Sequence, residues 1–138
     1  MELKEYDVIS SGTCAAEALL IRSPLSFWGG VDIKTGRIID VYHQDYDACM
    51  SGKILCFPYD RGSCSGSGVM LEMMRLGTAP AGILCIEAEP VLALAPLIGK
   101  KLYGRELPIR TISEEEYKKI PCSGCRISFM EDSILISK

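Results

Sequence analysis

The chain has 138 residues, of which 48% are hydrophobic and 24% are charged, and its formal net charge is −3 at pH 7. This length fits one domain, residues 1–138, and the composition argues against a disordered chain. The negative charge argues against nucleic-acid binding, and no stretch reaches the roughly 18 consecutive apolar residues of a membrane helix. Because the opening residues also lack the apolar core of a signal peptide, we expect a cytoplasmic protein that binds neither nucleic acid nor membrane.

Short strands account for the first part of the chain. The apolar pattern and the turn residues between its segments predict strands around residues 6–10, around 17–21, at 36–41 and at 53–57. The last of these, closed by Pro58, is a compact apolar run and indicates a buried strand. Residues 43–52 are polar and predict a loop, in which the lone histidine, His43, is expected to be solvated.

The second part alternates helices with strands. Val69, Met70, Met73 and Leu76 share one helical face, which predicts a helix from about Ser65 to Leu76. The elements expected after it are a strand at 81–86, a helix at 90–98 that stops near Gly99, a strand at 107–111, a short helix opened by a capping box at 113–116, and a hairpin of 126–129 with 133–137. This order predicts the α/β class: one β/β/α domain, with a short parallel sheet in the C-terminal half and a β-rich N-terminal half.

The residues best suited to chemistry form the loop Arg61–Gly68, Arg-Gly-Ser-Cys-Ser-Gly-Ser-Gly, between a buried strand and an amphipathic helix. Its small residues let a ligand approach the backbone, and the start of the helix offers N–H donors and a positive dipole, which suit an anion. Ser63, Ser65 and Ser67 add hydroxyls, and Arg61 adds a positive charge. The same residues also suit a plain turn and helix cap, so the loop alone leaves both interpretations open.

Familiar motifs are absent from this loop. Its glycines do not form Gly-x-Gly-x-x-Gly, no Gly-Lys-Ser/Thr follows, and none of its serines is centred in Gly-x-Ser-x-Gly. Since no base partner for a serine nucleophile can be named either, the sequence argues against a serine hydrolase.

Further segments make the chain similar to a known family. They are Pro24-Leu-Ser-Phe-Trp-Gly-Gly-Val-Asp32, Thr35-Gly36-Arg-Ile-Ile-Asp40, Gly52-Lys-Ile-Leu, the loop Arg61–Gly68, and Ala79-Pro80. In this order, between about Gly12 and Ile112, they resemble the small-subunit domain of the aconitase X family. The resemblance implies a swivelling domain that docks on a large subunit, and an iron–sulfur cluster held mainly by that large subunit.

The resemblance also implies a dehydration reaction on a small anionic substrate. One branch of the family acts on cis-3-hydroxy-L-proline, which the form of the serine loop favours, and the other acts on 5-phosphomevalonate. The implied base is Ser63, with Ser65 as its rival. The residues implied in substrate binding are Arg61, Gly62, Ser65, Gly66, Ser67 and Gly68. Alone, the chain is expected to be inactive, and a non-catalytic anion-binding or scaffold domain remains the alternative from another class.

Seven cysteines, an odd number without a secretory signal, indicate reduced thiols rather than disulfides. Cys122-x-x-Cys125 has metal spacing but lacks the second pair of a structural zinc site, so no metal site is predicted in this chain. A packing role is expected for this pair, with a thiol that reaches the partner's cluster as the alternative. Trp28 is expected either to fill space in the core or to contact a partner at a docking surface. Asp32 is expected to form a turn in which its side chain accepts a backbone N–H.

Overall fold

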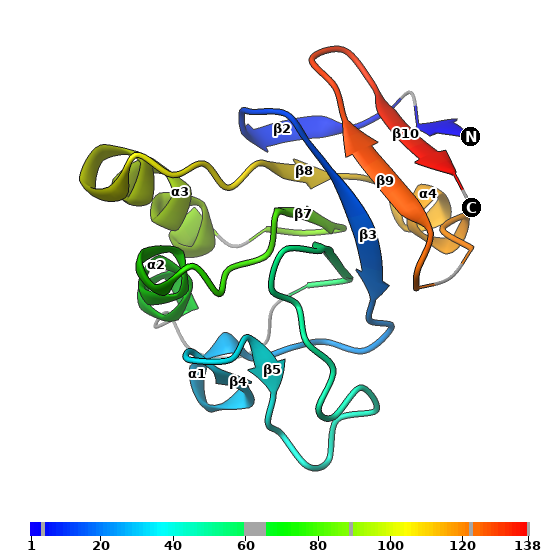
Figure 1. The fold of residues 1–138 in the computed structure, drawn as a ribbon. Coiled ribbons are helices and arrows are strands. Elements are labelled where there is room, and N and C mark those ends of the chain that lie inside the picture. The colour runs from blue at the N-terminus through cyan, green and yellow to red at the C-terminus, as the bar shows by residue number, and fades with distance from the viewer. Residues whose placement is uncertain (4, 60–65, 89, 122, 138) are drawn as a thin grey trace.

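The computed structural model describes residues 1–3, 5–59, 66–88, 90–121 and 123–137, without the side chains of Trp28, Ser67 and Val91. A curled sheet forms the body of the molecule, with α2 and α3 beside one face and α4 near the hairpin β9–β10 (Figure 1). None of the helices in the described part combines the length and the apolar character that a membrane span requires.

The sheet contains eight strands among the described residues, in the order β1-β10-β9-β3-β6-β7-β8-β2. Their bounds are β1 Glu2–Leu3, β2 Asp7–Ser10, β3 Cys14–Leu20, β6 Ile54–Phe57, β7 Gly82–Cys85, β8 Ile109–Thr111, β9 Arg126–Phe129 and β10 Ile134–Ser137. The middle strands β3, β6, β7 and β8 are parallel, and the outer pairings are antiparallel. The first two strands of the chain therefore lie at opposite ends of the sheet.

Four helices and a small ribbon complete the described fold. The helices are α1 Phe27–Gly30, α2 Gly66–Leu76, α3 Pro90–Tyr103 and α4 Glu114–Lys118. The ribbon pairs β4, Val31–Asp32, with β5, Arg37–Ile38, outside the main sheet. It lies with α1 below α2 in the view of Figure 1.

The central strands β6 and β7 are buried on both faces of the sheet. Along β6, Leu55 and Phe57 belong to the core beneath α2 and α3, whereas Ile54 and Cys56 belong to the core beside α4 and the hairpin. A strand buried on both faces has no polar side, which is why β6 and β7 are continuous apolar runs in the sequence. The predicted buried strands are confirmed.

The predicted α/β class and the parallel sheet are also confirmed, although β3 from the N-terminal half joins that sheet. The strand expected at 36–41 is wrong in its extent and its place, because β5 contains only Arg37–Ile38 and pairs outside the main sheet. The strand ends where the Asp40 carboxylate accepts the backbone N–H of Tyr42 at 3.0 Å and begins a turn.

The expected stop of the second long helix near Gly99 is wrong. Helix α3 continues to Tyr103 and ends before Gly104, whose φ of 65° favours glycine. Gly99 instead serves helix packing, since a Cβ there would lie 2.5 Å from the Cε of Met74 on α2. The small residue lets α2 and α3 approach each other.

Candidate functional site at the carboxyl edge of the parallel strands

The predicted serine loop connects β6 to α2. Arg61, Gly62, Ser63 and Ser65 lie outside the described residues, as does Cys64. Gly66, Ser67 and Gly68 form the first turn of α2, so the helix expected from about Ser65 is confirmed from Gly66 onward. In open parallel sheets, ligands bind at the carboxyl ends of the strands, which is the edge where this loop begins.

Helix α2 is held on the sheet by the apolar side chains of its buried face. Met70, Met73 and Met74 pack into the core on the sheet, while Arg75 pairs with Glu72 on the outer side. The first turn contains no acidic residue, so no carboxylate of its own neutralises the partial positive charge of this helix end. Gly68 is exposed, and a Cβ at this position would have no atom within 4 Å among the described neighbours. Among the described residues nothing covers the start of α2 at Gly68, and the charge of this helix end suits an anion.

The entrance to the loop is tied to the end of the next strand. The backbone N–H groups of Ile86 and Glu87 both donate to the carbonyl of Pro58, at 3.0 and 3.1 Å. These bonds hold Pro58, the residue after β6, beside the connection from β7 to α3. The chain therefore leaves β6 beside the carboxyl end of β7.

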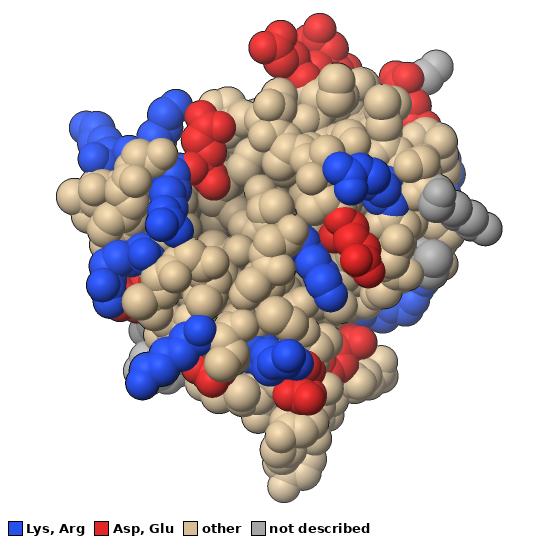
Figure 2. Space-filling view, in the orientation of Figure 1, with Lys and Arg blue, Asp and Glu red and all other residues tan. Residues whose placement is uncertain are grey.

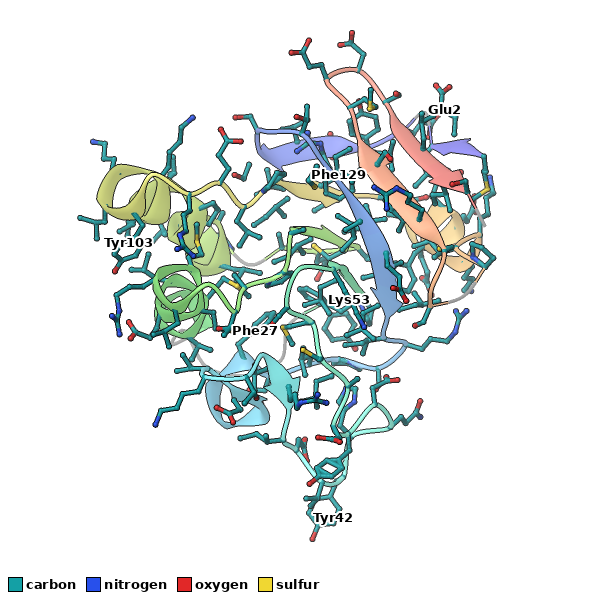
Figure 3. The ribbon with its side chains drawn as sticks, in the orientation of Figure 1. Glu2, Phe27, Tyr42, Lys53, Tyr103 and Phe129 are labelled. Carbon is teal, nitrogen blue, oxygen red and sulfur yellow. The ribbon has the colours of Figure 1, made fainter. Side chains whose placement is uncertain are left out.

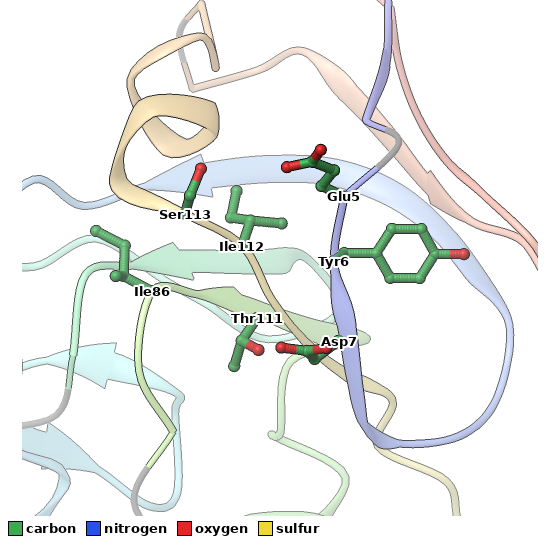
Figure 4. Close-up of a pocket in the computed structure, with 7 residues that line it drawn as sticks. All are labelled: Glu5, Tyr6, Asp7, Ile86, Thr111, Ile112 and Ser113. Atoms are coloured by element: carbon green, nitrogen blue, oxygen red, sulfur yellow. The ribbon is translucent and has the colours of Figure 1, made fainter.

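A cleft of about 490 Å³ opens at this same edge. The residues that line it are Glu5, Tyr6, Asp7, Ile86, Thr111, Ile112 and Ser113 (Figure 4). They come from the ends of β7 and β8 and from the segment that leads into β2. In Figure 4 the Tyr6 ring points away from the other side chains, so the polar lining consists of carboxylates and hydroxyls.

The charge of the cleft differs from that of the helix start. Glu5 and Asp7 contribute carboxylates, and Thr111 contributes a hydroxyl. Ser113 is already engaged, because its Oγ accepts the backbone N–H of Glu116 at 3.1 Å and caps α4. The cleft therefore carries negative charge from Glu5 and Asp7, whereas the start of α2 is suited to an anion.

The glycine-rich segment before β4 supports the base of the loop. Phe27 is buried, and its ring lies edge-on to Phe57, with centroids 5.6 Å apart and planes at 79° (Figure 3). Phe57 is the last residue of β6. Sequence reasoning considered Trp28, whose side chain lies outside the description, and missed Phe27. The expected turn at Asp32 is confirmed, because its Oδ1 accepts the N–H of Lys34 at 3.0 Å.

The expectation that His43 is solvated is wrong. Only 5% of its side chain is exposed, although Tyr42 beside it points away from the body of the protein (Figure 3). The Nδ1 atom accepts the backbone N–H of Asp45 at 3.0 Å, so Nε2 carries the proton and donates to Ser23 Oγ at 3.2 Å. A histidine that donates to a serine cannot deprotonate it, and this cluster is not a hydrolase dyad.

Two of the described thiols, those of Cys14 and Cys56, are poorly suited to bind a cluster. Burial raises the pKa of Cys56, and it raises the pKa of Cys14 to about 11, whereas iron–sulfur clusters bind thiolates. Cys125 is buried, and Cys122 lies outside the described residues. In the part of the chain that the structure describes, no group of three metal-binding side chains could hold a metal ion.

Comparison with known proteins identifies relatives over most of the chain. Residues 4–135 match the aconitase X swivel domain. The chain is 45% identical over 101 residues to the phosphomevalonate dehydratase small subunit of Methanopyrus kandleri, which covers 72% of this chain and 73% of that one. It is 41% identical over 104 residues, or 75% of its length, to the cis-3-hydroxy-L-proline dehydratase of Pseudomonas aeruginosa, of which it spans 18%.

A solved structure has the same fold. The crystal structure of Thermococcus kodakaraensis aconitase X in its holo-form superposes with a TM-score of 0.83 and 28% sequence identity, over 95% of both chains. The curled sheet, the strand–loop–helix order of the site and the family match agree with the resemblance in the sequence motifs. The chain therefore belongs to the family of aconitase X swivel domains.

Proposed function

We propose that this chain is the small subunit of an aconitase X-type hydro-lyase, a dehydratase that acts only with its large subunit. The observation that carries the proposal is the match of residues 4–135 to the aconitase X swivel domain. The place of the predicted loop supports it, since the loop joins the carboxyl end of β6 to the open start of α2. The thiols of Cys14, Cys49 and Cys56, which form no disulfide, support a reducing, cytoplasmic location.

Ser63 is the proposed base. Its alkoxide would accept a proton from a substrate carbon, the C–H electron pair would form the double bond, and the hydroxyl on the neighbouring carbon would leave. An alkoxide at neutral pH needs strong stabilisation, which Arg61 and the α2 dipole can provide once water is excluded. Ser65 is the alternative base because it has the same chemistry two residues further along.

Substrate binding is assigned to the rest of the loop. Arg61 and the backbone N–H groups from Gly62 to Gly68, including Ser65, Gly66 and Ser67, would bind the carboxylate or phosphate of a small anion. Between the two candidate substrates we favour cis-3-hydroxy-L-proline. Its ring ammonium would suit the cleft with Glu5 and Asp7, where a phosphate would be repelled.

5-Phosphomevalonate remains the second candidate. The 45% identity to a phosphomevalonate dehydratase small subunit supports it as directly as the 41% identity to a hydroxyproline dehydratase supports the first. Both substrates carry a carboxylate, so both could use the start of α2. The two substrates differ in their second charged group, which is a ring ammonium in cis-3-hydroxy-L-proline and a phosphate in 5-phosphomevalonate.

The iron–sulfur cluster implied by the family is assigned to the large subunit. The raised pKa values of Cys14 and Cys56 disfavour these thiols as cluster ligands, and no step of the proposed reaction passes through this chain's cysteines. What this chain would supply is the base, the anion site and one wall that excludes water. A scaffold that binds an anion without chemistry is the competing interpretation.

The experiment is anaerobic co-expression with the large subunit from the same organism, followed by assays of both substrates. We expect the complex to dehydrate cis-3-hydroxy-L-proline and the isolated chain to be inactive. Turnover of 5-phosphomevalonate alone would assign the chain to the other branch. A cluster-loaded complex that dehydrates neither substrate would contradict the proposal and favour the scaffold.

A further inference from the structure

We propose that the outer face of α3, together with strand β2, is a surface on which the large subunit docks. This inference rests on the proposed function, which supplies the partner. The surface, called here the α3 docking face, is made of the exposed apolar side chains of Val8, Ile9, Leu94, Leu97, Ile98 and Leu102.

Helix α3 is apolar on two sides, although one side suffices to hold it on the sheet. Leu92 and Ala95 are buried on the inner side, where Gly99 approaches α2. On the outer side, Leu97 is 67% exposed and Leu102 is 64% exposed. A helix at a protein–water boundary normally has a polar outer side, so a second apolar stripe indicates a second partner.

The stripe continues onto the end of the sheet. A groove of about 430 Å³ separates α3 from β2, and Val8, Ile9 and Leu97 contribute to its walls. β2 is the last strand of the sheet at this end, and its order next to β8 places it beside the cleft described above. The exposed apolar side chains of the helix and of the edge strand thus lie on the two sides of one groove, whose lining also contains Lys100 and Glu106.

The charges around this face argue against a second copy of the chain as its cover. Lys100, Lys101 and Arg105 lie at the end of α3, and only Lys100 has a described ion pair there, at 3.5 Å from Glu106. Figure 2 shows Lys and Arg side chains at the left of the view, where α3 lies in Figure 1, although the chain as a whole is acidic. Two such faces would repel each other, whereas an apolar surface with an acidic rim would fit.

The position of the face favours the large subunit in particular. Helix α3 begins at Pro90, on the carboxyl edge from which the serine loop starts, and Leu94 lies about 6 Å further along its axis. A partner that seals the loop from water would therefore reach the stripe. In the Pseudomonas aeruginosa relative, this domain makes up only 18% of the protein, so a much larger body is available to cover it.

The test measures the affinity of the isolated chain for the anaerobically prepared large subunit by calorimetry. The double variant Leu97→Gln/Leu102→Gln should weaken binding by about 10-fold or more, because central apolar contacts dominate interface energy. The matched control is Leu135→Gln, which changes an exposed leucine on β10 at the other end of the sheet and should leave the affinity unchanged. Circular dichroism and thermal unfolding check that each variant folds.

The outcomes separate this inference from the proposed function. If the unsubstituted chain binds and the double variant binds equally well, the docking face is misassigned while the subunit role stands. If, in addition, the unsubstituted chain is a dimer in light scattering and the variant a monomer, a second copy covers the face. If the unsubstituted chain forms no complex, the proposed function itself fails, and the inference fails with it.

Discussion

The guanidinium group of Arg110 lies over the ring of Phe129, 5.2 Å from its centroid. The same group donates hydrogen bonds to the carbonyls of Ser10 and Gly12, each at 2.6 Å, and its side chain is only 2% exposed. Arg110 thereby joins β8 to β9 and to the turn between β2 and β3. Burial lowers the pKa of the guanidinium. The cation–π contact and the two carbonyls offset part of its lost hydration, while Nε is buried without a hydrogen-bond partner among the described residues.

Substitution of this arginine should destabilise the fold. Arg110→Met would leave the carbonyls of Ser10 and Gly12 without this donor, so we expect the free energy of unfolding to fall by about 2–4 kcal/mol. Arg110→Lys retains a positive charge, so its free energy of unfolding should fall by less than that of Arg110→Met. Urea denaturation of both variants measures this, and a change below about 0.5 kcal/mol for Arg110→Met would show that the contact contributes little.

A pair of glycine variants should separate packing from function. Gly82→Ala in β7 would place a methyl group 2.8 Å from Cys14 Sγ and 3.0 Å from Phe129, so it should lower the free energy of unfolding by about 1–3 kcal/mol. Gly68→Ala meets open space in α2 and should not lower it. In the active complex, however, Gly68→Ala should raise KM, because its methyl group enters the proposed anion site. An unchanged KM would remove Gly68 from that site.

The thiol of Cys14 should be unreactive at neutral pH. Burial raises its pKa to about 11, so alkylation by iodoacetamide at pH 8 should be slow and should accelerate with unfolding. The unfolded thiol ionises at lower pH than the folded one, so stability should fall as the pH rises from about 9 toward 11. Mass spectrometry of labelled peptides measures the first effect. Fast labelling of Cys14 in the folded protein would contradict the burial.

The cleft carboxylates should influence substrate choice. In the complex, Glu5→Gln/Asp7→Asn should lower kcat/KM for cis-3-hydroxy-L-proline by about 3-fold, the size expected for exposed charge interactions. The same variant should not impair turnover of 5-phosphomevalonate, whose phosphate these carboxylates would repel. Steady-state assays at low salt compare the two substrates. Equal losses for both would indicate that the carboxylates do not face the substrate.

The sequence predicted well where a local pattern determines the structure. Continuous apolar runs identified β6 and β7, and the start of α2 follows from the change to a helical period at Val69. Prediction from the sequence failed where two residues that contact each other are far apart in the chain. The residues next to Arg110 in the sequence do not indicate that it donates hydrogen bonds to carbonyls about a hundred residues away. Gly99 predicts the end of a helix, and only the contact with Met74 in the structure explains why a glycine lies inside α3.

The same limit applies to the candidate site. The glycine–serine loop stands out in the sequence because its composition is local. The cleft beside it does not stand out, because Glu5 and Thr111 meet only through the pairing of β2 with β8. His43 was misjudged for a related reason, since its hydrogen-bond partner Ser23 lies twenty residues earlier in the chain.

The most direct test compares Ser63→Ala with Ser65→Ala in the cluster-loaded complex. Removal of a base should reduce kcat by at least about 100-fold, while the complex and its cluster spectrum remain unchanged. We predict that loss for Ser63→Ala and a smaller effect, mainly on KM, for Ser65→Ala. Near-normal turnover by Ser63→Ala would contradict the assignment, and loss of turnover in Ser65→Ala alone would transfer the role to Ser65.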